Sequence, residues 1–162
     1  MVGLPPPIPA QFAVCAERAA ARYHLPAQLV EAIIHQESGR VGHVVWDRNG
    51  TYDIGPMQVN SCWLSKLAQY GITRPMVEGN ACENIAIGSW ILARNLAHYG
   101  VTGTNYVQHP AQLGYAIMAY NIGTRWTADT YPIGLRYARS VLIYWHGLYR
   151  ETVAAVRAGS ES

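Results

Sequence analysis

Apolar residues recur at helical spacing along most of this chain, in segments that begin near proline or asparagine and end near glycine. Within residues 26–38, Leu29, Val30, Ile33 and Ile34 fall on one face of a helix. Proline fits the first turn of a helix, and glycine commonly follows its last residue. Spacing, capping residues and alanine content predict further helices at residues 11–23, 61–70, 80–99, 110–123 and 133–149. The chain is therefore expected to fold mainly by packing helices together.

One segment departs from helical spacing. Residues 40–58 combine Gly, Asn and Asp with Val and Tyr, and Asn49-Gly50 stands between short flanks, which is a strong hairpin signal. We predict a mainly α (α+β) fold, a single domain with a small β-hairpin insert. No repeat or linker divides the chain, so we expect an extended arm at residues 1–9, one domain at 10–150 and a tail at 151–162.

Composition excludes several classes of protein. The 162 residues are 50% hydrophobic and 14% charged, which suits one domain with its own core. The formal charge of +2 is too small for nucleic-acid binding, and no apolar run approaches the roughly 20 residues of a membrane span. The first residues do not read as a secretory signal, which leaves a trimmed leader, another export route or a cytosolic location open.

The remaining polar residues point to no cofactor and no metal. The six histidines lack metal-ligand spacing, and the chain has neither a Ser-His-Asp grouping nor a glycine-rich phosphate loop. Three cysteines allow one bridge plus a free thiol in an exported protein, or three reduced thiols in a cytosolic one. The residues alone leave both alternatives open.

Glu37 interrupts an apolar helix face. It follows Leu29 and Ile33 at steps of four, and it lies in the last turn near the negative end of the helix dipole. Apolar surroundings and the dipole both raise the pKa of a carboxyl, which favours a general acid. The alternative is a helix-end glutamate that turns into solvent.

Three motifs then follow in order. They are His35-Gln36-Glu37-Ser38-Gly39, Tyr52-Asp53-Ile54-Gly55-Pro56-Met57-Gln58-Val59-Asn60 and Ala119-Tyr120-Asn121-Ile122-Gly123. Together they resemble the signatures of the lytic transglycosylases with a lysozyme-like fold, in particular the small specialised enzymes of type III and type IV secretion, conjugation and pilus systems. The likeness covers about residues 12–149 and implies a lysozyme-like single domain.

The resemblance assigns catalytic roles to three residues. Glu37 would protonate the bond between N-acetylmuramic acid and N-acetylglucosamine, and would then accept the proton of the muramoyl 6-hydroxyl to give a 1,6-anhydro end. Tyr120 would donate a hydrogen bond to the Glu37 carboxyl. Asp53 also matches the aspartate position of c-type lysozymes, so it either stabilises positive charge at the anomeric carbon or merely bonds its own turn.

Five further residues would form the substrate site. By the same resemblance, Ser38 and Gln58 would face the glycan, Met57 would line the cleft and Asn121 would contact substrate. Tyr137 matches a signature tyrosine that approaches the catalytic glutamate, although core packing is the alternative.

The resemblance also covers two cysteines and leaves two departures. Cys15 and Cys82 match cysteines of the secretion-associated members, which implies a Cys15–Cys82 disulfide with Cys62 free. Pro56 replaces a usual leucine and Ile122 a usual alanine. We expect Pro56 to remove a backbone N–H from the sheet and Ile122 to add bulk at the cleft, altering the substrate fit.

The implied function is local, non-hydrolytic opening of peptidoglycan in the periplasm for a secretion or conjugation apparatus. Peptidoglycan strands are the expected partner, apparatus proteins are possible further partners, and we expect a monomer. Two alternatives stay open. They are a hydrolytic muramidase that uses Glu37 and Asp53, and a glycan-binding assembly module without turnover.

Overall fold

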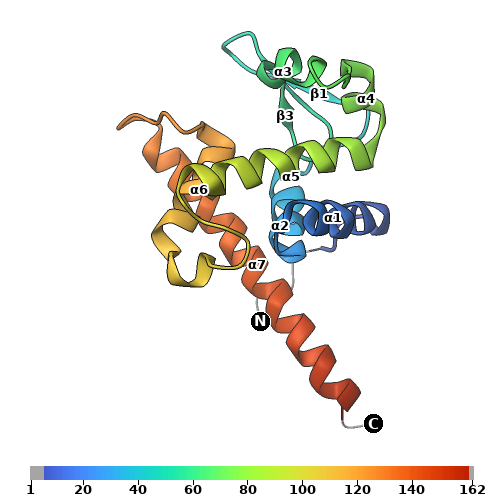
Figure 1. The fold of residues 1–162 in the computed structure, drawn as a ribbon, viewed down its shortest axis with the longest axis vertical. Coiled ribbons are helices and arrows are strands. Elements are labelled where there is room, and N and C mark those ends of the chain that lie inside the picture. Colours follow the sequence, from blue (N-terminus) through green and yellow to red (C-terminus); the bar gives the residue numbers. More distant parts are fainter. Residues whose placement is uncertain (1–5, 161–162) are drawn as a thin grey trace.

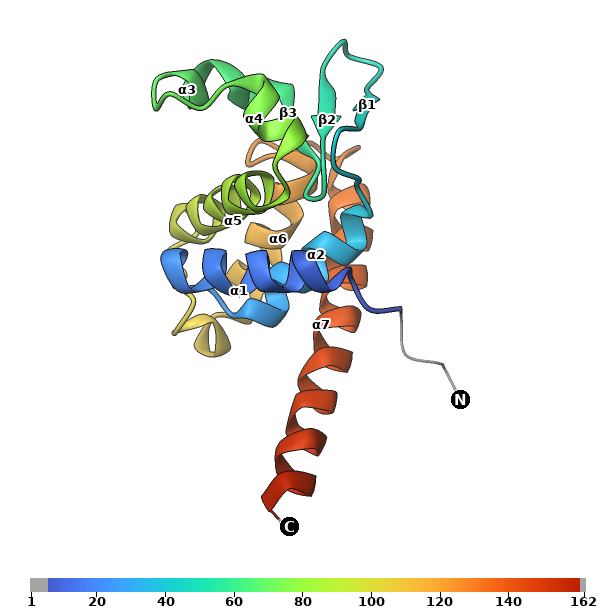
Figure 2. The ribbon, with the colours of Figure 1, turned by 90° about the vertical axis from the view of Figure 1, so that its right-hand side faces the viewer.

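Helix α5 (Ala81–His98) runs between two groups of elements (Figure 1). The sheet, α3 and α4 lie on one side of α5, while α1 and α2 lie on the other, and a perpendicular view shows the same division (Figure 2). Helix α6 packs against α5 and α7, and α7 packs against α2. The site predicted from the motifs therefore combines residues from both groups.

The structure, a computed structural model, describes the backbone of residues 6–160 and the side chains of residues 6–147. Its elements in chain order are α1 (Ala10–Tyr23), α2 (Ala27–Glu37), β1 (Val44–Trp46), β2 (Tyr52–Ile54), β3 (Val59–Asn60), the 3₁₀ turn η1 (Ser61–Trp63), α3 (Leu64–Ala68), α4 (Arg74–Gly79), α5, the 3₁₀ turn η2 (Tyr106–Gln108), α6 (Pro110–Ile122) and α7 (Tyr131–Ser160). A mainly helical single domain with a small antiparallel sheet is thus confirmed.

Three helical predictions need correction. Helix α4 was not predicted, the segment at 61–70 is divided into η1 and α3, and α7 continues to Ser160 instead of ending near residue 149. Residues 1–5 of the predicted arm and 161–162 of the predicted tail lie outside the described residues. In the described part of the chain, no helix has the length and apolar character of a membrane span.

The predicted hairpin is present and carries a third strand. Strand β1 pairs antiparallel with β2, and β2 pairs antiparallel with β3. The hairpin loop closes where the Asp47 N–H donates to the Thr51 carbonyl at 2.8 Å, and Gly50 supplies a positive φ of 84°. Because β2 is the central strand, Asp53 lies between Val45 on one side and Asn60 on the other.

Helix α2 ends in a way that places its last side chain. Ser38 caps the helix in the left-handed region at φ 53°, and its N–H donates to the Ile34 carbonyl at 3.0 Å. Gly39 is needed for a different reason, since a Cβ there would lie only 1.8 Å from the Gly55 carbonyl oxygen. This close approach brings the end of α2 directly beside the turn between β2 and β3.

The disulfide implied by the family resemblance is confirmed. Cys15 on α1 is bonded to Cys82 on α5, with their Cα atoms 4.9 Å apart. Cys62 has a free, exposed thiol. The bridge joins α1 to α5 at the core, to which Cys15 belongs together with Leu29 and Ile33.

The expected loss of a sheet N–H at Pro56 is wrong, while the effect of Pro56 and Ile122 on the substrate fit stays a prediction. Pro56 lies in the turn between β2 and β3, which closes through a 3.0 Å hydrogen bond from the Gln58 N–H to the Gly55 carbonyl, so no sheet N–H is lost. Ile122 packs at the contact between α6 and α7, where a Cβ on Gly134 would lie 2.5 Å from its Cδ1. Its bulk is accommodated by that glycine.

Candidate active site

Glu37 and Tyr137 form the centre of the candidate site. Glu37 is the last residue of α2, and its carboxyl accepts a 2.5 Å hydrogen bond from the Tyr137 hydroxyl on α7. The same two helices meet again where the His35 ring stacks on the Tyr144 ring, with centroids 3.8 Å apart. Two contacts along one helix pair thus fix where the acidic side chain points.

Burial raises the pKa of Glu37 from its ordinary value of 4.5 to about 7. Loss of water is the largest cause, and the negative charge of Asp53 acts in the same direction. The Tyr137 hydrogen bond favours the ionised carboxylate and offsets part of the rise. The upward direction predicted from the helix pattern is therefore found, and near neutral pH the group can both give and take a proton.

Asp53 lies on the middle strand and accepts a 2.9 Å hydrogen bond from the side-chain amide of Asn60. The same Asn60 amide also reaches Asp47, at 3.1 Å. Burial is the largest cause that raises the pKa of Asp53, the charge of Asp47 adds to it, and the Asn60 hydrogen bond lowers it. Asp53 is thus oriented from the neighbouring strand, and its catalytic role stays a prediction.

The predicted hydrogen bond from Tyr120 to Glu37 is wrong. The Tyr120 hydroxyl donates instead to the backbone carbonyl of Met57 at 2.8 Å, and Tyr137 bonds the carboxyl. Tyr120 is still near the acid, because the Glu37 charge contributes to a raised pKa of its phenol, after burial as the main cause. The sequence analysis therefore placed Tyr120 near Glu37 correctly but assigned its hydroxyl the wrong hydrogen-bond acceptor.

Met57 is completely buried, so the prediction that its side chain lines the cleft is also wrong. Its side chain packs in the core between α5 and α6, where Gly88 leaves room for it: a Cβ at Gly88 would lie 2.6 Å from the Met57 sulfur and 2.8 Å from the Tyr120 oxygen. The Met57 backbone carbonyl, and not its side chain, accepts the hydrogen bond from Tyr120.

Asn84 was missed by the sequence reasoning. It is completely buried on α5, its side-chain oxygen accepts from the Met57 N–H at 2.9 Å, and its amide donates to the carbonyls of Ile54 at 2.8 Å and Val77 at 3.1 Å. The available signal was the same one that revealed Glu37, because Asn84 shares a helix face with buried Gly88 and Ile91.

The other predicted binding residues lie around the same turn and helix ends. The Ser38 hydroxyl donates to the His35 carbonyl at 2.7 Å, and the Gln58 amide donates to the Gly55 carbonyl at 2.9 Å. Gln58 has a positive φ of 50°, an uncommon conformation for a residue with a side chain. Asn121 is exposed near the end of α6. Their contacts with a glycan stay predictions.

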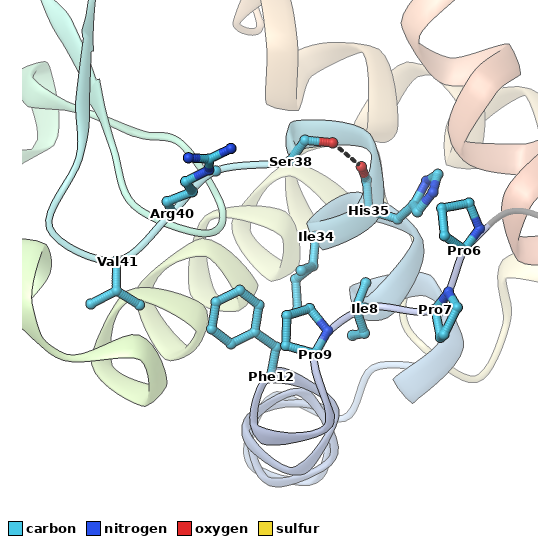
Figure 3. Close-up of a pocket in the computed structure, with 11 residues that line it drawn as sticks. Pro6, Pro7, Ile8, Pro9, Phe12, Ile34, His35, Ser38, Arg40 and Val41 are labelled. Carbon is cyan, nitrogen blue, oxygen red and sulfur yellow. Dashed lines mark hydrogen bonds between the residues drawn. The ribbon is translucent and has the colours of Figure 1, made fainter.

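A separate hollow of about 370 Å³ lies behind the end of α2 (Figure 3). It is lined by the arm Pro6–Pro9, by Phe12, by Ile34 and His35 on α2, and by the following loop Ser38–Val41. Neither Glu37 nor Asp53 lines it, so the hollow is not the site of the acid. The dashed bond in Figure 3 joins the Ser38 hydroxyl to the His35 carbonyl, and both residues line the hollow.

The described residues contain no group of three or more His, Cys, Asp or Glu side chains placed to hold a metal ion. One carboxyl can carry a proton at neutral pH, a second carboxyl lies within electrostatic range, and a phenol holds the first in place.

A mainly helical domain with a small sheet and a buried acid at the end of a core helix defines a lysozyme-like class of protein. Residues 14–131 match the family described as the transglycosylase SLT domain. Since the match covers more than half of the chain, this protein belongs to that family, whose members are typically lytic transglycosylases.

Three relatives have comparable similarity. The chain is 29% identical over 134 residues to the invasion protein IagB of Salmonella typhimurium, which covers 80% of this chain and 74% of that protein. It is 30% identical over 112 residues to the protein IpgF of Shigella flexneri, covering 68% and 66%. It is 30% identical over 135 residues to the X polypeptide of Escherichia coli, covering 83% and 73%.

Proposed function

We propose that this protein is a lytic transglycosylase that cleaves the β-1,4 bond between N-acetylmuramic acid and N-acetylglucosamine in peptidoglycan. One observation carries the proposal: the largely buried Glu37 carboxyl has a pKa of about 7 and is held by the Tyr137 hydroxyl. A catalytic acid needs its proton near the working pH and a fixed direction in which to deliver it. Membership of the transglycosylase family supports the choice of substrate.

Glu37 acts twice in the proposed reaction. Its proton moves to the glycosidic oxygen, the bond from that oxygen to the anomeric carbon breaks, and positive charge develops on the sugar. The Glu37 carboxylate then removes the proton of the muramoyl 6-hydroxyl, whose oxygen bonds the anomeric carbon. The products are a 1,6-anhydro end and a free 4-hydroxyl, no water is consumed, and Glu37 regains its proton.

The neighbouring residues assist this step. Asp53 stabilises the positive charge at the anomeric carbon from its position on β2, while Ser38, Gln58 and Asn121 contact the glycan. Tyr137 orients the Glu37 carboxyl, and its hydrogen bond is stronger to the ionised group, which supports the half-step in which Glu37 is a base.

A hydrolytic muramidase is the second candidate. The observation that favours it is the Asp53 charge, which lies close enough to raise the pKa of Glu37, so two carboxyls share the site. In that reaction water replaces the 6-hydroxyl and the product is a reducing end. A glycan-binding module without turnover is the third candidate, and it predicts no bond cleavage at all.

The proposed setting is the periplasm, where the protein opens the wall locally for a secretion or conjugation apparatus. The Cys15–Cys82 disulfide supports an oxidising compartment. The relatives include one named an invasion protein, which supports a link to a bacterial apparatus without identifying it.

Digestion of purified sacculi followed by mass spectrometry of the muropeptides tests the proposal. We expect 1,6-anhydro ends from the wild type and none from Glu37→Gln, which keeps the shape of the side chain but carries no acidic proton. Reducing ends lost in Asp53→Asn would establish the muramidase instead. Wild-type digestion no greater than that of Glu37→Gln would favour the module without turnover.

A further inference from the structure

The candidate site is divided between two parts of the molecule. Glu37 and Tyr137 come from α2 and α7, whereas Asp53 and Gln58 come from the sheet and its turn. Catalysis by the proposed route requires the relative position of these two parts to be fixed to within a fraction of an ångström. A misplacement of about 1 Å can lower the rate about 100-fold. Some contact must therefore fix the turn at residues 55–58 against the helices.

Asn84 on α5 holds the turn in place through hydrogen bonds. Its side chain bonds the Met57 N–H, within the turn, and the Ile54 carbonyl, at the end of the strand that carries Asp53. The third bond, to the Val77 carbonyl, anchors the same amide to α4. With no exposed surface, Asn84 has no water to replace these partners, so each lost bond leaves a buried polar group unpaired.

Tyr120 makes the second contact, from α6. Its hydroxyl donates to the Met57 carbonyl at 2.8 Å, so Asn84 and Tyr120 together bond both the N–H and the carbonyl of one residue. Gly88 on α5 lets Met57 and Tyr120 come close to that helix, because a Cβ there would overlap both side chains. Residues on α5 and α6 thus hold Met57 in place through hydrogen bonds to both sides of its backbone.

We propose that Asn84 and Tyr120 are positioning residues that fix the turn between β2 and β3, and through it Asp53 and Gln58, relative to Glu37. The inference rests on the proposed function for its effect on turnover. It assigns Tyr120 a role through the Met57 backbone, and it gives Asn84 a role in the site through hydrogen bonds to backbone groups.

The test compares Asn84→Ala and Tyr120→Phe with Asn95→Ala. Asn95 is a matched control because it is a buried asparagine on the same helix, and its amide bonds the Ala116 carbonyl at 3.4 Å, away from the turn. Turnover of soluble, uncrosslinked glycan strands gives kcat and KM for each variant. Titration of the Glu37 carboxyl carbon by NMR gives its pKa without requiring turnover.

We expect kcat to fall about 10–100-fold in Asn84→Ala and about tenfold in Tyr120→Phe, with KM changed less than kcat. The Glu37 midpoint should move to lower pH, because a loosened turn admits water and carries the Asp53 charge away, while Tyr137 on α7 keeps its hydrogen bond. Asn95→Ala should keep kcat within about twofold and leave the midpoint unchanged.

Two outcomes would overturn the inference. If Asn84→Ala and Asn95→Ala lose similar stability and both keep kcat and the Glu37 midpoint, then Asn84 is only a structural residue. If Asn84→Ala does not fold, Tyr120→Phe decides, since it removes a single hydroxyl, and an unchanged midpoint and kcat would refute the positioning role. A wild type without lytic activity but with a shifted midpoint in the variants would refute the proposed function and keep this inference.

Discussion

Replacing Glu37 by glutamine should make the protein more stable above neutral pH while it removes the catalytic acid. Glutamine keeps the oxygen that accepts the Tyr137 hydrogen bond but never ionises. The pKa of Glu37 rises from 4.5 to about 7, and this difference of about 2.5, at about 1.4 kcal/mol for each pKa unit, corresponds to about 3.5 kcal/mol at full ionisation. That free energy is the cost of ionising the carboxyl in the folded site.

The sign follows from proton linkage. The folded protein holds the Glu37 proton more tightly than the unfolded chain does, so the stabilisation by this proton is fully present below about pH 4.5 and is lost as the pH rises through about 7. The glutamine variant is therefore expected to equal the wild type near pH 4. It should exceed the wild type by about 3 kcal/mol near pH 8.

Urea denaturation at both pH values measures this difference. Glu17→Gln is the control, because Glu17 is exposed on α1 and its replacement changes the net charge by the same amount. If the gain of Glu37→Gln between pH 4 and pH 8 is no larger than that of Glu17→Gln, the carboxyl is ionised without cost and the reasoning from burial to a catalytic acid fails.

Two further predictions follow from single contacts. Tyr137→Phe removes a hydrogen bond that favours the ionised Glu37, so the pKa of Glu37 should rise. The basic limb of the pH–activity profile should then move up by about 1 pH unit. An unchanged limb would show that this hydrogen bond does not control the pKa of Glu37. The double variant Cys15→Ser, Cys82→Ser removes a disulfide between positions 67 apart in the sequence. Urea denaturation under non-reducing conditions should show a free energy of unfolding lower by about 2–4 kcal/mol. A loss below about 1 kcal/mol would mean that packing alone holds α1 against α5.

Much of the fold follows from local patterns. The helix predicted at residues 80–99 begins as expected, since the Asn80 side-chain oxygen accepts from the Glu83 N–H at 3.0 Å and caps α5. The hairpin follows from Asn49-Gly50, because that pair suits a tight turn with positive φ. Helix α4 was missed because its six residues are too short to establish an apolar period.

Glu37 is the residue of the site that the sequence by itself determined. Its position at a step of four after Ile33 places it on the same face of α2 as the apolar Leu29 and Ile33, because helical geometry is local. Burial of a carboxyl raises its pKa by the same physics in any fold.

Only the tertiary structure decided which partners this carboxyl has. Tyr120 and Tyr137 are both plausible donors in sequence, and the packing of α7 against α2 brings Tyr137, one hundred positions away, into hydrogen-bond contact. The role of Asn84 depends likewise on a turn of another element that lies against its helix. A hydrogen bond requires a separation of about 3 Å, and no sequence pattern specifies distances between elements that meet only after the chain has folded.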